Sequence, residues 1–346
     1  FSNFIFDVSS SLEKFVTYKN GEWDSSNNQQ LPAKIITLHY TNNVWSSSEF
    51  ALPSEYSYIQ DIGISKNGQR IAIKTDLQSL YDNGMPTNPN FPQVAIVVFE
   101  NILGAWVKVG EPILLVDDII WPTLDENGNN LTFRINHNTD NSTNTAPVRV
   151  FTYANGSWNQ KGDKIYPLDD FDEHGKVVHI SADGQRIAIS SHKANGIDPI
   201  AWQYGGLDDS PVGPNIGCVN IYQYDNNNWQ LVSSLYGEDA GDQFGTNFHL
   251  SSNGNRIAIG SLNHDDISGH IRVFDYDSSL SSNALTGNYT QAGNDIDGSE
   301  LEGIGERFAM SGDGTTIISM NSLDSVQYDP AGTLFSTLKT YSSGVD

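Results

Sequence analysis

Short stretches of alternating apolar and polar residues, separated by polar turns, run along most of the chain. In the clearest case, Asp183-Gly184 separates a short strand ending at Ser181 from a β-branched apolar strand over 186–190. Glycine accepts a positive φ at no steric cost and aspartate tolerates it, so this dipeptide suits a tight turn. The pattern therefore predicts a β-hairpin.

The same hairpin phrase recurs along the chain. Close copies lie at 64–73 and 250–260, and weaker copies lie at 125–133 and 310–319. The turn glycines stand at positions 68, 128, 184, 254 and 314, which are 60, 56, 70 and 60 residues apart. A period of this size in an all-β chain is typical of a propeller or a solenoid.

A second strand pair follows each hairpin. Its best copies, 148–158 and 219–229, show an alternating strand, a polar turn and then a tryptophan. Two hairpins in series make one four-stranded antiparallel blade, so we expect an all-β fold with a single β-propeller domain over residues 1–346. Six blades are favoured, and seven result if the first 50 residues form two half-blades. The expected blades lie near 1–50, 52–112, 113–165, 172–235, 242–294 and 302–342. The recurring tryptophans are expected to pack in the core or between blades: Trp45, Trp106, Trp158 and Trp229.

Three phrases of the fifth unit carry a resemblance to a known family: Gly-Asp-Gln-Phe-Gly at 241–245, the hairpin at 250–261, and Gly-His-Ile-Arg-Val-Phe at 269–274. The chain resembles FG-GAP-type propeller repeats, found in integrin α-subunit heads and in many secreted proteins. Its Ser-x-Asp-Gly-x-Arg-Ile-Ala hairpin is also similar to repeats of TolB-type propellers. The resemblance implies a propeller but little about function, because propellers host unrelated activities. The Asp-x-Asp-x-Asp-Gly loop that holds calcium in integrin blades is absent from these hairpin turns.

The charge balance restricts the partners. The chain has 18 Lys and Arg against 42 Asp and Glu, a formal net charge of −24. Such an excess of negative charge argues against nucleic acid or an anionic membrane as partner. No apolar run approaches the roughly 18 residues of a membrane-spanning helix, so we expect no membrane insertion. The remaining partner classes are a protein, a glycan or further copies of this chain.

Several features predict an extracellular, secreted or cell-surface protein. The sequence begins at Phe1 without a methionine, as it would after removal of a secretion signal. Its single cysteine, Cys218, is expected to be a buried core residue. Four Asn-x-Ser/Thr sequons fall in predicted turns, loops or edges and are candidate N-glycosylation sites: Asn130, Asn141, Asn155 and Asn288.

Acidic loops are the sharpest candidates for a binding site. If the strands of each blade run antiparallel in order, the loops between second and third strands share one face with the connections between blades. Calcium takes six to eight oxygen ligands, and closely spaced carboxylates around a glycine can converge on it. The alternative is a solvated connector whose aspartates cap turns. The candidate calcium ligands are Asp239, Asp242, Asp295, Asp297 and Glu300.

A second candidate surface combines aromatic and acidic residues. Trp202 and Tyr204 lie in the long loop 192–217, and aromatic side chains of this kind suit sugar stacking or a protein contact. The alternative is a loop that folds over its own ring. The remaining candidate contacts come from an acidic run and are Asp169, Asp170 and Asp172.

Local catalytic motifs are missing. None of the eight histidines sits in a His-x-His or His-Glu-x-x-His pattern, and no Gly-x-Ser-x-Gly elbow or phosphate-binding loop appears. We therefore assign no catalytic residue and expect a non-catalytic binding or structural module, for example a subunit of a surface or filament assembly. The alternative is a propeller glycoside hydrolase or lyase with a carboxylate pair, about 5 to 9.5 Å apart, near the axial funnel.

Overall fold

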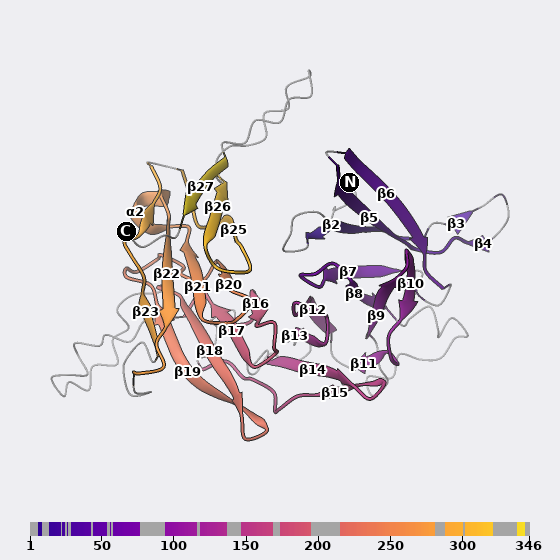
Figure 1. Cartoon of the computed structure of the whole chain (residues 1–346), viewed down its shortest axis with the longest axis horizontal. Coiled ribbons are helices and arrows are strands. Elements are labelled where there is room, and N and C mark those ends of the chain that lie inside the picture. The colour runs from indigo at the N-terminus through magenta and orange to yellow at the C-terminus, as the bar shows by residue number, and fades with distance from the viewer. Residues whose placement is uncertain are drawn as a thin grey trace, which may run out of the picture. The chain divides into compact units, whose positions relative to one another are not determined.

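The computed structural model (Figure 1) is built almost entirely from antiparallel strands. It forms two compact units, Phe1–Ile165 and Tyr166–Asp346, which are described separately below. One short helix, α2 (His264–Ile267), occurs in the described part of the chain. The structure describes residues 6–8, 14–21, 23–24, 26, 29–42, 44–53, 56, 58–76, 94–115, 118–136, 147–168, 174–194, 215–280, 288–299, 302–320 and 338–342.

The first unit holds three larger sheets in chain order, each a meander in which successive strands pair. The first sheet contains β1 (Phe6–Val8), β2 (Lys14–Lys19), β5 (Lys34–Thr41) and β6 (Val44–Ala51). The second contains β7 (Ile59–Ile64), β8 (Arg70–Asp76), β9 (Val94–Ile102) and β10 (Ala105–Lys108), with β11 (Ile113–Leu115) also on β9. The third contains β12 (Asp118–Leu124), β13 (Asn130–Asn136), β14 (Val148–Ala154) and β15 (Ser157–Gln160). A small ribbon consists of β3 (Trp23–Asp24) and β4 (Gln29–Gln30).

The second unit repeats this plan. Its first sheet contains β16 (Val178–Ile180), β17 (Arg186–Ser191), β18 (Cys218–Asp225) and β19 (Asn228–Tyr236). The next contains β20 (Asn247–Leu250), β21 (Arg256–Ser261), β22 (His270–Tyr276) and β23 (Tyr289–Gln291), and β24 (Ile296–Asp297) extends the pairing on β22. The described strands of the last sheet are β25 (Arg307–Met310), β26 (Thr316–Met320) and β27 (Leu338–Ser342).

The repeated hairpin phrase has one hydrogen-bond pattern throughout, which confirms the predicted turns. Ser181 Oγ donates to Asp183 Oδ1 (2.6 Å) and accepts from the backbone N–H of Arg186 (2.9 Å). Gly184 follows with φ of 64°, a conformation that glycine adopts without a Cβ clash. This explains why the phrase needs Ser, Asx and Gly in that order. The same two contacts recur at Ser65, Ser251 and Ser311.

The arginine that ends each strong copy of the phrase joins one sheet to the next. Arg186 donates to the carbonyl of Gly254 (3.0 Å) and to Asn255 Oδ1 (2.7 Å) in the following hairpin turn. Its Nε also donates to Gln223 Oε1 on β18 (2.8 Å), so one guanidinium connects two sheets. The equivalent contacts run from Arg70 to Gly128 and Asn129, and from Arg256 to Gly314.

The β-branched residues after these arginines form the buried cores. Ile257, Ile259, Phe248 and Phe274 lie in one buried cluster of the second unit, as the alternation predicts. The tryptophans follow this plan only in part. Trp106 and Trp229 are buried and Trp158 is half-buried.

The packing predicted for Trp45 is wrong. Its side chain is 51% exposed, because it lies on β6, where 44–49 are all exposed. Its ring contacts the rings of Phe15 and Tyr40, which belong to the same sheet.

Candidate functional site

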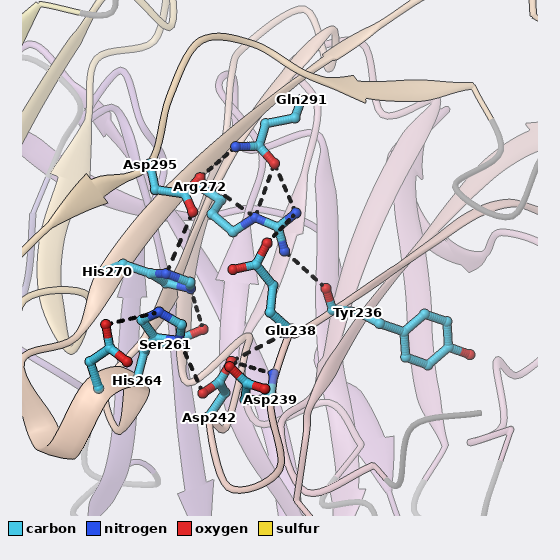
Figure 2. A network of polar contacts seen from close by, with 11 residues as sticks. Tyr236, Glu238, Asp239, Asp242, Ser261, His264, His270, Arg272, Gln291 and Asp295 are labelled. Carbon is cyan, nitrogen blue, oxygen red and sulfur yellow. Dashed lines mark hydrogen bonds and ion pairs between the residues drawn. The ribbon is translucent and has the colours of Figure 1, made fainter. Parts of the chain in front are cut away.

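Three connecting segments of the second unit meet beside β22. They are 237–246 before β20, 262–269 between β21 and β22, and 292–298 around the start of β24 (Figure 2). Backbone hydrogen bonds join them: Asn263 N–H donates to Asp242 O (3.4 Å), and Gly298 N–H donates to Gly269 O (2.9 Å). The turn into β22 requires glycine, because Gly269 has φ of 72° and an added Cβ would lie 2.1 Å from Ile304 O. The fold thus brings residues far apart in sequence into one cluster.

Asp242 and His264 form a rigid pair in this cluster. Asp242 is only 3% exposed, and its Oδ2 accepts the backbone N–H groups of Glu238 (3.2 Å) and Asp239 (3.0 Å). Its other oxygen, Oδ1, lies 3.2 Å from His264 Nδ1. The second ring nitrogen, Nε2, lies 3.7 Å from Oδ2 of the exposed Asp265, beyond hydrogen-bond distance. The loop backbone therefore fixes the carboxylate, and the carboxylate fixes the imidazole.

His270, the first residue of β22, is completely buried (0% exposed). Its Nε2 lies 3.0 Å from the hydroxyl of Ser261, its partner across the strand pair. Its Nδ1 has no hydrogen-bond partner among the described residues and lies 3.9 Å from Asp295 Oδ2. Burial, helped by the neighbouring His264 ring, lowers the pKa of His270 to about 4, although Asp295 and Asp242 oppose the shift. The ring is consequently neutral at neutral pH.

The two histidine rings are stacked. The ring centroids of His264 and His270 lie 3.9 Å apart, and the planes are inclined by 24°. Figure 2 shows both imidazoles next to one another, with Asp242 and Asp295 on different sides. The pair therefore offers two imidazoles, each beside its own carboxylate.

Arg272 lies between two of the acidic groups. Its guanidinium is 3.4 Å from Glu238 Oε1 and 3.9 Å from Asp295 Oδ1, and it donates to Gln291 Oε1 (2.8 and 3.1 Å). The Arg–Gln part of this arrangement is a feature of the repeat, because Arg149 donates in the same way to Gln160 in the first unit. We therefore assign Arg272 mainly to the scaffold.

His270 is not a feature of the repeat. It lies opposite Ser261, the fifth residue after the hairpin arginine. In the preceding sheet the equivalent pair is Ser191 opposite Cys218, and in the second sheet of the first unit it is Thr75 opposite Ala95. A small side chain is thus sufficient for the fold at this position. The imidazole is an addition specific to this sheet.

The cluster has the geometry of a cation site. Ligand atoms of Glu238, His264 and His270 lie within 4.8 Å of one another, and so do those of His270, Asp295 and Asp297. These groups combine imidazole nitrogen with carboxylate oxygen. The residues could therefore hold a metal ion.

The sequence located part of this cluster. Of the candidate calcium ligands, Asp295 and Asp297 lie beside His270 and Asp242 lies beside His264, whereas Asp239 is exposed and contributes its backbone N–H to Asp242. Glu238 belongs to the same acidic loop as Asp239 and Asp242, but the sequence pattern indicated neither histidine. A register comparison of the hairpins would have singled out His270 against Cys218, but nothing local identifies His264. Candidates outside the described residues are Asp169, Asp170, Asp172, Trp202, Tyr204 and Glu300.

The glycosylation candidates differ in their environment. Asn130 is only 6% exposed and its Nδ2 donates to Asp125 Oδ2 (2.7 Å), so the folded chain has no room for a glycan there and this assignment is wrong. Asn155 is exposed in the turn between β14 and β15. Asn288 is half-buried and contacts Tyr276 Oη (3.4 Å). Asn141 lies outside the described residues.

Comparison with known proteins gives structural matches only. No protein-family model matches the sequence, and no curated protein matches it. A putative 6-phosphogluconolactonase from Bacteroides uniformis is 11% identical with a TM-score of 0.53, over 98% of this chain and 84% of that one. The Pseudomonas aeruginosa periplasmic gluconolactonase PpgL is 14% identical with a TM-score of 0.51, over 99% and 86%. The β-propeller domain of the Trilobed protease from Pyrococcus furiosus is 11% identical with a TM-score of 0.45, over 97% and 81%.

These matches and the meander sheets agree with the predicted class, an all-β β-propeller fold of antiparallel four-stranded sheets. The resemblance to FG-GAP repeats is confirmed only at the level of the propeller, because no FG-GAP family model matches. At these identities the neighbours show the fold alone. No helix in the described part of the chain is long and apolar enough to cross a membrane.

The structural neighbours count against the expected non-catalytic binding or structural module and favour its alternative, a propeller enzyme. The two neighbours with TM-scores above 0.5 are described as lactonases, which are enzymes. Local sequence motifs cannot reveal a site whose side chains come from separate segments. Here the chemically capable side chains come from three segments between Glu238 and Asp297.

Proposed function

We propose that the chain is a propeller hydrolase that opens cyclic esters of sugar acids. The single observation that carries the proposal is the Asp242–His264 pair, in which a buried carboxylate held by two backbone N–H groups orients an imidazole. A general base needs this kind of support from a third group. The descriptions of the two structural neighbours supply the class of substrate.

The pair can move the protons that ester hydrolysis requires. An ionised Asp242 only accepts hydrogen bonds, so the imidazole proton of His264 stays on Nδ1 and Nε2 keeps its lone pair. Nε2 takes a proton from water as the water oxygen bonds to the ester carbonyl carbon. The ring C–O bond then breaks, and the leaving alkoxide takes that proton back. Lactone and water thus give one hydroxy acid, with His264 regenerated.

The surrounding groups suit a polyhydroxylated, uncharged substrate. The carboxylates of Glu238, Asp295 and Asp297 can accept hydrogen bonds from sugar hydroxyls. The guanidinium of Arg272 lies near Glu238 and Asp295, so the acidic side chains of the cluster outnumber this positive charge. A substrate phosphate would be repelled, so the proposal favours an unphosphorylated lactone.

A carboxylate pair for glycoside hydrolysis is less well supported. Asp295 and Asp297 offer oxygens within 4.8 Å of each other, well below the separation of about 6.5–9.5 Å in inverting glycosidases and nearer to the roughly 5–5.5 Å of retaining ones. Both also lie beside His270, an arrangement suited to a cation. A sugar-derived substrate remains the proposed ligand, and an extracytoplasmic location belongs to the same proposal, since one neighbour is described as periplasmic.

The test is whether the protein hydrolyses D-glucono-1,5-lactone faster than the uncatalysed rate, with the reaction measured as proton release in a pH-stat. Replacing His264 by Gln removes the base and should lower kcat about 10²–10⁴-fold. His249→Gln is the matched control. This histidine lies on β20, outside the three connecting segments, and packs against Phe308 on β25. Its replacement should leave kcat unchanged.

The 6-phospho form of the same lactone is the second substrate in this test. We expect a lower kcat/KM for it, because the phosphate meets the carboxylates. Equal rates for wild type and His264→Gln, or no lactone hydrolysis by the wild type, would overturn the proposal.

A further inference from the structure

The buried His270 is the polar group of the cluster that the proposed hydrolysis does not use. Its Nδ1 faces Asp295 Oδ2 across 3.9 Å and has no hydrogen-bond partner in the described part of the chain. Buried polar atoms are nearly always paired, so an exception calls for a physical reason.

The contact of the other ring nitrogen, Nε2, determines which tautomer of His270 leaves a lone pair free to bind a ligand. Nε2 lies 3.0 Å from Ser261 Oγ, so the Nε2–H form can donate to the hydroxyl and leaves a lone pair on Nδ1. That lone pair then points to a carboxylate, which is unfavourable unless a cation lies between them. Metal-binding histidines typically donate their second N–H to such an acceptor, which fixes the tautomer. Two ligand atoms of one ion, each about 2.1 Å from it, lie about 3–4 Å apart. The 3.9 Å between His270 Nδ1 and Asp295 Oδ2 falls in this range.

The strand pairing brings a third ligand to the same place. Asp297 on β24 is the register partner of His270 on β22, so the two residues are neighbours in the sheet. Ligand atoms of His270, Asp295 and Asp297 all lie within 4.8 Å of one another. Gln291 donates to Asp295 and keeps that carboxylate in position. Asp297 is exposed, which leaves access for an ion and for water.

We propose that His270 Nδ1, Asp295 and Asp297 form a binding site for a divalent transition-metal ion such as zinc or manganese. A nitrogen ligand favours these ions over calcium, which prefers six to eight oxygens. Three protein ligands leave coordination positions open, as in catalytic rather than structural sites. The site goes beyond the proposed hydrolysis and stands without it, because metal binding is measured in the absence of substrate.

The site is specific to this sheet. The positions equivalent to His270 carry Cys218 opposite Ser191 and Ala95 opposite Thr75. We therefore expect one ion bound by these residues, although the chain repeats its hairpin several times.

The test is calorimetric titration of chelator-treated full-length protein with ZnCl2, MnCl2 and CaCl2 in separate experiments. We expect one equivalent of zinc or manganese to bind at least 10-fold more tightly than calcium. CoCl2 should give the visible absorption of a protein-bound ion with a nitrogen ligand. Replacing Asp297 by Asn keeps the size of an exposed side chain and should weaken zinc binding at least 10-fold.

Asp265→Asn is the matched control, because Asp265 is an exposed aspartate of the same cluster that does not belong to the proposed ligand set. It should bind zinc as the wild type does. The proposal is overturned if the wild type binds none of the transition metals, if calcium binds most tightly, or if Asp297→Asn and Asp265→Asn have the same effect. The lactone assay of His264→Gln separately decides the proposed hydrolysis.

Discussion

At the scale of single residues, the sequence located carboxylates well and histidines poorly. Asp242, Asp295 and Asp297 stand out because acidic residues gather around glycines in connecting loops. The structure places Asp295 and Asp297 beside His270, and Asp242 beside His264. His270 occupies a strand position that carries Cys218 in the preceding sheet, so the fold does not require an imidazole there. Its importance depends on Ser261 and Asp295, which only the folded chain brings to its two nitrogens.

Asp125 provides a residue-scale prediction about stability. It takes the place that serine occupies in the other hairpin phrases, and burial raises the pKa of its carboxyl group. It accepts from the backbone N–H of Asn130 (3.0 Å) and from Asn130 Nδ2 (2.7 Å), while Asn130 Oδ1 has no partner among the described residues. In Asp125→Asn the new amide can donate to this oxygen if the Asn130 amide flips. The buried charge is removed at the same time.

We expect Asp125→Asn to be more stable than wild type at neutral pH by about 1 kcal/mol. Because the pKa is raised in the folded state, the contribution of Asp125 is fully present below the unfolded pKa of about 3.9 and is lost as pH rises through the folded value. The advantage of the variant should therefore grow from pH 4 to pH 7. Lys66, whose pKa is lowered mainly by burial, keeps Glu126 as a partner in the variant.

Urea denaturation at several pH values measures this difference. Asp163→Asn is a suitable control, since Asp163 is exposed and its replacement removes no buried charge. A variant that is less stable than wild type at pH 7 would contradict the proposed cost of the buried charge.

At the scale of elements, the hairpin phrase was predictable because its turn is locally determined. The Ser and Asp side chains of the turn at 181–186 form hydrogen bonds with each other and with backbone N–H groups no more than five residues away. The role of the following arginine was not predictable. Arg186 bonds to Gly254 and Asn255, which are 68 and 69 residues away along the chain.

Replacing Arg186 by Ala should weaken the contact between the two sheets and destabilise the fold. Its guanidinium lies 3.7 Å from the centroid of the Tyr276 ring, and its loss leaves the carbonyl of Gly254 with one donor fewer. We expect the free energy of unfolding to fall by about 2–3 kcal/mol. Arg186→Lys should recover only part of this, because lysine lacks the planar fork that stacks and donates at once.

The matched control is Arg307→Ala. Arg307 is an exposed arginine of the same unit whose Nε lies 3.8 Å from its neighbour Glu306. Exposed pairs of this kind contribute at most about 1 kcal/mol. Urea denaturation of both variants makes the comparison, and equal losses would mean that the inter-sheet contact of Arg186 does not stabilise the fold.

At the scale of the whole molecule, the repeat period was sufficient for the fold class but not for the activity. Sheets at intervals of about sixty residues follow from the turn glycines in the sequence, and successive strands pair within each sheet. The chemical groups obey no such period. They lie at irregular positions between Glu238 and Asp297 in the second unit, so neither repeat alignment nor local motifs could assemble them. The count of six blades in one domain remains a prediction.

The net charge leads to a prediction for the chain as a whole. With 42 acidic and 18 basic side chains, the formal charge of −24 favours expansion, because like charges repel more strongly in a compact fold. Added salt shortens the screening distance from about 30 Å at 0.01 M to about 10 Å at 0.1 M. We expect the melting temperature to rise over this range of NaCl.

Tetramethylammonium chloride at equal ionic strength separates screening from ion binding. It should produce the same rise, because a bulky monovalent cation screens charge without occupying a carboxylate site. If only small or divalent cations raised the melting temperature, the effect would belong to specific binding at sites such as His270–Asp295–Asp297. A melting temperature that stayed constant or fell with NaCl would show that repulsion between the acidic side chains does not destabilise the fold.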